Sequence, residues 1–247
     1  MTDNFREKIS SGCAALGIGT DSDKLEKLFR YYEMVTEKNK VMNLTSITDE
    51  NEFIAKHIID SLSIVKSIDL AGMLESGGKY RMIDIGTGAG FPGMVLKIVF
   101  PELDVTLFDS LKKRLNFLDE VTEELGLDGI RTLHGRAEDY GRNKEYRDSF
   151  DLVFSRAVAN MSSLSEYCLP FVKVGGIFAA YKTSDSAEEI KAAEHAIAKL
   201  GGKTEKTDSF VLPGSDIGRS IVIVRKLKKT PGQYPRKAGM PTKEPLD

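Results

Sequence analysis

A short apolar segment followed by a glycine-rich turn constrains the fold of this chain more than any other feature. Residues 82–93 read MIDIGTGAGFPG, and the apolar run FPGMVLKIVF covers 91–100. Such a pattern predicts a buried strand, a tight turn and a helix, because glycine tolerates the backbone angles of the turn. Pro92 suits the first turn of that helix. A strand–turn–helix unit of this kind can hold a nucleotide-like ligand against backbone N–H groups.

The glycine loop allows two interpretations. Counted from Asp84 it reads D-x-G-x-G-x-G, as in many methyltransferases that bind S-adenosylmethionine. Counted from Gly88 it reads G-x-G-x-x-G, as in dinucleotide-binding oxidoreductases. Asp109, about 20 residues further on at a strand end, suits the ribose of either ligand. Asp84 favours S-adenosylmethionine, because a carboxylate repels a pyrophosphate and attracts a cationic ligand. An NAD(P)-dependent oxidoreductase is the alternative from a different class.

Strands and helices alternate beyond residue 80. The predicted strands are 80–86, 104–109, 130–135, 150–157 and 177–182, with a final antiparallel pair at 203–213 and 218–227. The predicted helices between them are 91–100, 110–127, 161–176 (running into a glycine turn) and 186–202. This alternation predicts an α/β fold with a parallel sheet and helices on both faces. The closing antiparallel pair is typical of the Rossmann-like sheet of class I S-adenosylmethionine-dependent methyltransferases.

The N-terminal region shows a helical pattern instead. Apolar residues recur at helical spacing between Leu25 and Val35 and again over 54–68. The candidate N-caps are Asp21 or Ser22 for the first helix and Asp49 or Asn51 for the second. We therefore divide the chain into a helical extension (1–70), a Rossmann-like domain (71–227) and a basic, proline- and glycine-rich tail (228–247).

The composition excludes several classes of protein. A formal net charge of -2 argues against a surface coated in positive charge for non-specific nucleic-acid binding. The two cysteines, Cys13 and Cys168, lack C-x-x-C spacing, which indicates a reducing compartment and no metal site. The first residues do not resemble a signal peptide, and no apolar run is long enough to span a bilayer. We expect a cytoplasmic protein with no membrane contact and no obligate protein partner.

The end of the fourth predicted strand reads FSRAV (154–158), at a place where many methyltransferases carry their target chemistry. It lacks the D/N-P-P-Y/F element of many amino-directed enzymes, and Cys168 fits a helix core better than a nucleophile. Since no base is evident, the site suits an acceptor that loses no proton, such as guanine N7. Alignment alone then contributes roughly 7–11 kcal/mol. Arg156 either orients the base or cofactor or forms a structural salt bridge.

A specific combination of motifs runs along nearly the whole chain. The motifs are MNLTSITDENEFIAKHIIDSL (42–62), DIGTGAGFPGMVLKI (84–98), LFDSLKKRLNFL (107–118), HGRAED (134–139), FSRAVA (154–159), GRSIVIV (218–224) and YPRKAGMPTKEPL (234–246). Together they resemble one family, the ribosomal RNA small-subunit guanine-N7 methyltransferases (RsmG, also called glucose-inhibited division protein B). The resemblance implies S-adenosylmethionine as donor, a guanine in the 530 loop of 16S rRNA as acceptor, and the small ribosomal subunit or an assembly intermediate as partner. The alternatives are a methyltransferase acting on another RNA or a small molecule, and a non-enzymatic RNA-binding module.

The resemblance and the loop analysis together give the expected site residues. The expected cofactor contacts are Asp84, Gly86, Gly88, Phe91, Asp109, Ser110, Ala137, Glu138 and Arg156. Among these, Asp109 is implied as the ribose partner, and Ala137 and Glu138 as the pair that flanks the adenine. The expected catalytic or RNA-contacting arginines are Arg136, Arg156 and Arg219.

Other polar residues receive structural interpretations. His57 is expected to anchor the N-terminal helices to the catalytic domain through Asp60 or the backbone, and Asn43 and Thr45 to order the loop that faces the target. The run Lys112-Lys113-Arg114 is interpreted as a solvated helix face. The C-terminal tail is either a flexible phosphate-binding segment, in which Tyr234 stacks on a base, or a disordered end. Its basic residues, counted from the last strand, are Arg225, Lys226, Lys228, Lys229, Arg236, Lys237 and Lys243.

Overall fold

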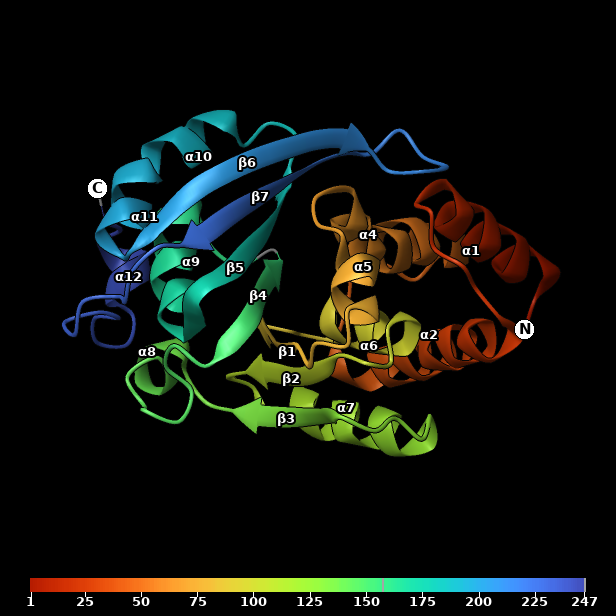
Figure 1. Ribbon diagram of the computed structural model, residues 1–247. Helices are drawn as coiled ribbons and strands as arrows, with labels where there is room; N and C mark the ends of the chain where they lie inside the picture. Colours follow the sequence, from red (N-terminus) through yellow and green to blue (C-terminus); the bar gives the residue numbers. More distant parts are fainter. Residues whose placement is uncertain (157, 247) are drawn as a thin grey trace.

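Seven strands form one sheet in the structure, a computed structural model that describes residues 1–156 and 158–246 (Figure 1). The strand order is β3-β2-β1-β4-β5-β7-β6, with β1 to β5 parallel and β7 antiparallel to both of its neighbours. The strands are β1 (Arg81–Ile85), β2 (Asp104–Asp109), β3 (Ile130–His134), β4 (Phe150–Arg156), β5 (Val172–Thr183), β6 (Gly202–Val211) and β7 (Gly218–Lys226). The predicted α/β alternation and closing antiparallel pair are confirmed.

Two elements differ from the sequence prediction. The stretch 172–176, expected as a helix end and a glycine turn, is the first part of β5. Phe150 pairs with Val172, and the register then shifts so that Leu152 pairs with Ile177. This irregularity accommodates the extra residues, glycines included, so the strand continues through them. The helix expected over 186–202 is divided into two short helices, α10 (Ala187–Ala192) and α11 (Glu194–Lys199).

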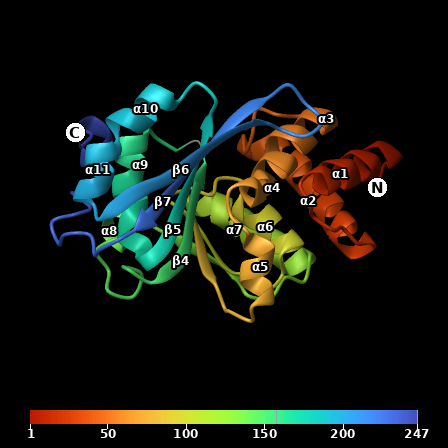
Figure 2. The ribbon, with the colours of Figure 1, turned by 45° about the horizontal axis from the view of Figure 1, so that its top comes forward.

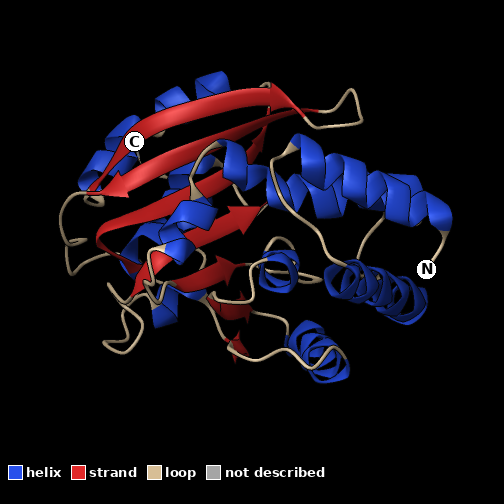
Figure 3. Ribbon diagram, turned by 45° about the vertical axis from the view of Figure 1, so that its right-hand side comes forward, coloured by secondary structure: helices blue, strands red, loops and turns tan. Residues whose placement is uncertain are grey.

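The sheet separates two hydrophobic clusters, and each is covered by helices (Figures 2 and 3). Adjacent strand residues point to opposite faces, so Met82 joins one cluster and Ile83 the other. The first face carries α1 (Asp3–Ala15), α2 (Ser22–Met42), α3 (Glu50–Phe53), α4 (Asp60–Leu62), α5 (Leu70–Glu75), α6 (Gly93–Val99) and α7 (Lys112–Glu124). The second carries α8 (Ala137–Tyr140), α9 (Met161–Cys168), α10 (Ala187–Ala192) and α11 (Glu194–Lys199). Helices on both faces are confirmed, and Cys168 is a buried core residue as predicted.

The N-terminal helices share a core with the sheet. Phe5 and Phe53 belong to the same cluster as Met94 and Leu118. The buried hydroxyl of Tyr31 donates a hydrogen bond to the carbonyl of the glycine-loop residue Ala89. The boundary at residue 70 stays a prediction, because the described residues on both sides of it belong to one cluster. Within the described ranges, no helix has the length and apolar character that crossing a membrane requires.

The second helical run begins at its predicted cap but is not a regular α-helix. Asp49 accepts a hydrogen bond from the N–H of Glu52 at 2.9 Å and so caps α3. A π-helix, η1 (Ile54–Ile59), follows, then α4 and a 3₁₀ turn, η2 (Ser63–Lys66). Helical periodicity in the sequence does not distinguish these forms. Single-turn π-helices occur often at functional sites, and this one carries His57, three residues before Asp60.

The C-terminal segment is docked on the second face, so the expectation of a free basic tail is wrong for much of its length (Figure 1). Tyr234 is 7% exposed within the second cluster and is not free to stack on a base. Lys226 is fully buried and donates to the carbonyl of Leu169. Arg236 forms a bidentate ion pair with the buried carboxylate of Glu166. The tail residues that remain exposed cations are Lys228, Lys229, Lys237 and Lys243.

The sheet order reverses between β1 and β4, and ligands of open α/β sheets bind at such a point. The carboxyl ends of the parallel strands meet the start of β7 at the same edge, because β7 runs the opposite way. Arg156 at the end of β4 pairs with Tyr181, and two residues later Thr183 pairs with Arg219. Residues far apart in the sequence are therefore brought to one edge of the sheet.

Candidate active site

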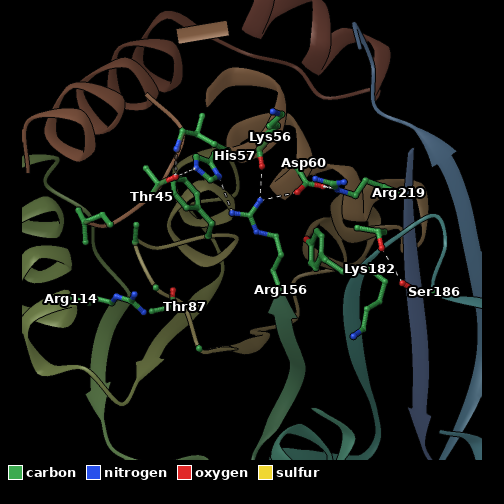
Figure 4. A pocket seen from close by; sticks show the side chains of 18 of the residues that line it. Thr45, Lys56, His57, Asp60, Thr87, Arg114, Arg156, Lys182, Ser186 and Arg219 are labelled. Carbon is green, nitrogen blue, oxygen red and sulfur yellow. Dashed lines mark hydrogen bonds and ion pairs between the residues drawn. The ribbon is translucent and has the colours of Figure 1, made fainter. Parts of the chain in front are cut away.

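Two adjoining cavities open at this edge. The first, of about 550 Å³, is lined by the loop before α3, by η1, by the glycine loop and by the ends of β4, β5 and β7 (Figure 4). The second, of about 420 Å³, lies over the ends of β2 and β3. Gly86, Arg114 and Arg156 line both cavities. A ligand that extends from one cavity into the other would pass these three residues.

The glycine loop is tied to the end of β2. Gly86 has a φ of +74° and Gly88 a φ of +61°, which side chains rarely adopt. A Cβ on Gly86 would lie 2.5 Å from a methyl carbon of Val158. The N–H of Gly86 donates to the carbonyl of Phe108 at 2.8 Å, and that of Gly88 donates to the carboxylate of Asp109 at 2.9 Å. These hydrogen bonds fix the conformation of the loop. Its residue Gly86 lines both cavities.

We expected Asp84 to face the ligand, but its side chain lies beneath this loop. Its side chain is fully buried and lines neither cavity. Oδ2 accepts hydrogen bonds from the hydroxyl of Thr87 at 2.7 Å and from the N–H of Gly93 at 2.8 Å. Oδ1 has no partner among the described residues. Burial raises the pKa of this carboxyl to about 6. Asp84 therefore holds the shape of the loop, and any effect on a ligand acts through the loop.

Asp109 ends β2 in the second cavity, with Ser110 beside it. Its carboxylate is 4% exposed and accepts from the N–H groups of Gly88 and Leu111, at 2.9 and 2.8 Å. The guanidinium of Arg114 lies 3.7 Å away. A carboxylate has about four acceptor positions, so Asp109 retains capacity for hydroxyl donors. Arg114 was expected on a solvated helix face and lines both cavities instead.

Arg136, Ala137 and Glu138 form the opposite wall of the second cavity. The carboxylate of Glu138 is 6% exposed, and its Oε1 accepts from the N–H of Gly239 at 2.8 Å. Thr242, in α12 (Met240–Lys243), also lines this cavity. The docked C-terminal segment is therefore part of the wall, a contribution that no motif predicted.

Arg156 is at the centre of the first cavity (Figure 4). Its Nη1 donates to Asp60 Oδ2 at 2.8 Å and to the carbonyl of Lys56 at 2.7 Å. The Nε of Arg219 donates to the other oxygen of Asp60 at 2.9 Å. Asp60 is 1% exposed and thus holds one guanidinium on each oxygen. Both arginines are fixed in place without a ligand. Arg156 therefore forms a structural salt bridge and also lines both cavities, so the two interpretations of this residue hold together.

His57 lies between Arg156 and Thr45. Arg156 Nη2 donates to Nδ1 of His57 at 3.1 Å, and Nε2 lies 2.8 Å from the hydroxyl of Thr45. The ring stacks on Phe91 with 4.3 Å between centroids and 8° between planes. Burial, and then the charge of Arg156, lower the pKa of His57 to about 3. His57 does link the N-terminal helices to the catalytic edge, but through Arg156 and Phe91.

Positive charge exceeds negative charge around the first cavity. The cations that line it are Lys56, Arg114, Arg156, Lys182 and Arg219. The lining carboxylates are Asp60 and Glu189, and both are ion-paired: Asp60 with the two arginines, and Glu189 with Lys182 at 2.6 Å. Such a surface suits a polyanion.

The structure brings together only some of the residues that the sequence singled out. Arg156 and Arg219 meet at Asp60, whereas Arg136 lies in the second cavity, exposed and apart from them. Asn43 is exposed, with a left-handed backbone conformation that ends α2. The role of Asp60 as a shared partner was missed. Its position three residues after His57 on a helical pattern was the available signal, since such residues share a face.

The doubly wound sheet, its closing antiparallel pair, the glycine loop after β1 and the carboxylate at the end of β2 define a class I methyltransferase. A family model described as "rRNA small subunit methyltransferase G" matches residues 24–217. The chain therefore belongs to the rRNA small subunit methyltransferase G family. This membership removes the dinucleotide oxidoreductase alternative.

Individual relatives agree with the family match. The "Ribosomal RNA small subunit methyltransferase G" of Exiguobacterium sp. (strain AT1b) is 50% identical over 94% of this chain and 95% of its own length. The protein of the same name from Clostridium tetani is 48% identical over 98% of this chain and 99% of its own. A solved structure described as "Conversion of a Disulfide Bond into a Thioacetal Group during Echinomycin Biosynthesis" has a TM-score of 0.50 and 15% identity, covering 64% of this chain and 80% of that one. That likeness shows the fold alone.

Proposed function

We propose that this protein transfers the methyl group of S-adenosylmethionine to N7 of a guanine in the 530 loop of 16S ribosomal RNA. The observation that carries the proposal is the state of the proton acceptors in the first cavity. His57 accepts from Arg156 and its pKa is lowered to about 3. The carboxylates of Asp60 and Glu189 are ion-paired. Among the described residues the cavity thus offers donors and cations but no free base, and an acceptor that loses no proton needs none.

The residues present fit S-adenosylmethionine. Asp109 has acceptor capacity for the ribose hydroxyls, and we assign the adenine to Ala137 and Glu138, which line the same cavity. Gly86 lines both cavities and carries no side chain, which allows close approach of the ligand to the loop backbone. Asp84 holds the loop through Thr87 and Gly93 and so fixes the backbone surface that the ligand would contact. When bound, the ligand supplies an electrophilic methyl group on a positively charged sulfur.

The protein's own contribution is orientation and charge placement. The N7 lone pair forms the new C–N bond while the electrons of the C–S bond stay on sulfur, so positive charge moves to the purine and no proton leaves. Asp60 keeps the Arg156 guanidinium in one position, where it faces both cavities. Alignment of this kind can supply roughly 7–11 kcal/mol of the barrier reduction.

The RNA partner is supported by the charge around the first cavity, together with family membership. Lys56 and Arg114 add cations to the lining of this cavity, and such cations can contact phosphates without reading the sequence. A substrate within the ribosome would place the protein in the cytoplasm, which is the compartment that the sequence predicted.

The test is methyl transfer from S-adenosylmethionine with a labelled methyl group to small subunits that lack the modification, followed by digestion of the RNA to nucleosides and mass spectrometry. We expect label in 7-methylguanosine, mapped to the 530 loop, and no label in subunits that already carry the modification. Label in another nucleoside would keep the donor and overturn the acceptor. Absence of label despite binding of S-adenosylhomocysteine would point to a different acceptor molecule.

A further inference from the structure

Thr45 is held in place more firmly than an ordinary loop residue. It lies between α2 and α3 and lines the first cavity. Its N–H donates to Oδ1 of Asn39 at 2.9 Å, and Nδ2 of Asn39 donates back to its carbonyl at 2.8 Å. One side-chain amide thus satisfies both backbone groups of Thr45. The residue is therefore fixed at the cavity wall before any ligand binds.

The direction of each hydrogen bond at the Thr45 hydroxyl follows from its neighbours. A guanidinium is a donor only, so the bond from Arg156 makes Nδ1 of His57 an acceptor. A neutral imidazole then carries its hydrogen on Nε2, which lies 2.8 Å from the Thr45 oxygen. That oxygen also accepts from the N–H of Ile47 at 3.1 Å. Both of its lone pairs are therefore occupied.

Only the hydroxyl hydrogen of Thr45 remains available. No acceptor for it is present among the described residues. A hydroxyl is normally ambivalent, because it rotates to donate or accept as its partner demands. Here the network from Arg156 through His57 removes that ambivalence. Thr45 is left as a fixed, uncharged donor at the wall of the first cavity.

We propose that the Thr45 hydroxyl donates a hydrogen bond to O6 of the acceptor guanine and so selects guanine over adenine; this inference rests on the function proposed above. On the edge of guanine that carries N7, the neighbouring group is the O6 acceptor, whereas adenine presents an amino donor there. A donor-only hydroxyl pairs with O6 and opposes the amino group. A donor on O6 also leaves the N7 lone pair free, while a donor on N7 would block the reaction.

The arginines of the same cavity are less suited to this discrimination. Arg156 and Arg219 are committed to Asp60, and their charge would attract any phosphate or carbonyl. Selection against a base needs an element that is unfavourable with the wrong partner as well as favourable with the right one. A neutral hydroxyl whose lone pairs are occupied meets that requirement.

The experiment pairs a protein variant with a substrate analogue. Small subunits are reconstituted with ligated 16S RNA that carries either guanosine or 2-aminopurine riboside at the acceptor position, because the analogue keeps N7 and lacks O6. The second-order rate constant for methyl transfer is measured for the wild-type protein, Thr45→Val and Thr45→Ser, under single turnover with excess enzyme. Thr48→Val is the matched control, since Thr48 is an exposed threonine in the same loop.

We expect the wild-type protein to prefer guanosine to the analogue, and Thr45→Val to reduce that preference about tenfold, the size of one hydrogen bond to a buried partner. Thr45→Ser and Thr48→Val should keep the wild-type preference. If Thr45 only supports the loop, Thr45→Val lowers both rates by the same factor and the inference is overturned.

The wild-type protein alone gives a second test that needs no variant. Equal rates on guanosine and 2-aminopurine would overturn the inference even if Thr45→Val failed to fold. A wild-type protein that places no methyl group on the guanosine substrate would overturn the proposed function, and with it this inference. That failure is recognised in the first reaction, before any analogue or variant is used.

Discussion

The two cavities share three residues but are built in different ways. The second depends on backbone groups at the ends of consecutive strands, with Asp109 held by the N–H groups of the glycine loop and of Leu111. The first depends on side chains from distant segments, joined in the chain Thr45–His57–Arg156–Asp60. A cavity made from local backbone tolerates a single substitution better than one made from a shared network. The comparison therefore predicts larger effects in the first cavity.

The largest effect is expected from Asp60→Ala. The change leaves two guanidinium groups, 15% and 20% exposed, without the carboxylate that they share. Breaking a buried ion pair in this way costs about 3–5 kcal/mol. The measurement is the free energy of unfolding in urea. The control is Asp23→Ala, because Asp23 is 70% exposed and pairs with Lys27 on a helix surface. Its loss should lower the free energy of unfolding by less than about 0.5 kcal/mol. Equal losses would remove the distinction between a buried network and a surface pair.

Arg156→Ala should slow methyl transfer about a hundredfold or more, since removal of one preorganised hydrogen-bond donor from an active site has effects of that size. Single-turnover rates at saturating S-adenosylmethionine and RNA are the measurement, with circular dichroism to check the fold. Arg131→Ala is the control, because that guanidinium is 48% exposed and pairs with Asp104 away from both cavities. A wild-type rate in Arg156→Ala would make its contacts purely structural.

Asp84→Asn should change how stability depends on pH, by an amount on the order of 2 kcal/mol. Burial raises the folded-state pKa of Asp84 from 3.8 to about 6, so the folded wild-type protein binds more protons than the unfolded chain between these values. Its contribution to wild-type stability therefore falls as pH rises from about 4 to 6. The asparagine variant lacks this titration, so it gains stability relative to wild type over that window. Urea unfolding of both proteins between pH 4 and 7 tests this, and parallel curves would contradict it.

The smallest effect is expected from Asp109→Asn in the second cavity. An amide keeps one acceptor oxygen, and the loop N–H groups remain, so we expect affinity for S-adenosylhomocysteine to fall only roughly tenfold. Isothermal titration calorimetry measures it, with the exposed Asp128→Asn as control. If the fold loss of affinity in Asp109→Asn exceeds the fold loss of rate in Arg156→Ala, the second cavity is the more sensitive one and the comparison is reversed.

The sequence predicted correctly those features that are formed by residues close together along the chain. The strand before Gly86, the loop and the carboxylate at Asp109 follow from local burial patterns and spacing, and all lie where predicted. The caps Asp21 and Asp49 were among the predicted candidates and both accept the expected hydrogen bond. Local rules suffice there, because each feature depends on neighbours a few residues away.

The failures have a common physical cause. Asp84 was expected to face the ligand because its charge was considered without its burial. Tyr234 and Arg236 were expected on a free tail, yet an apolar surface beside α9 and the buried carboxylate of Glu166 hold them in place. In each case the tertiary environment decided the outcome: burial beneath the loop for Asp84, and partners distant in the sequence for Tyr234 and Arg236.

The sequence by itself determined the class of fold, the glycine loop and the family, because alternating burial and contiguous motifs need no knowledge of distant partners. Only the tertiary structure decided which charged residues meet. Lys56 and Arg156 are 100 positions apart, and Asp60 and Arg219 are 159 apart. They come together because parallel strands end at one edge of the sheet and β7 begins there. At that edge Arg156 orients His57, and His57 in turn leaves the Thr45 hydroxyl as a hydrogen-bond donor only. The C-terminal segment contributes Thr242 to the wall of the second cavity.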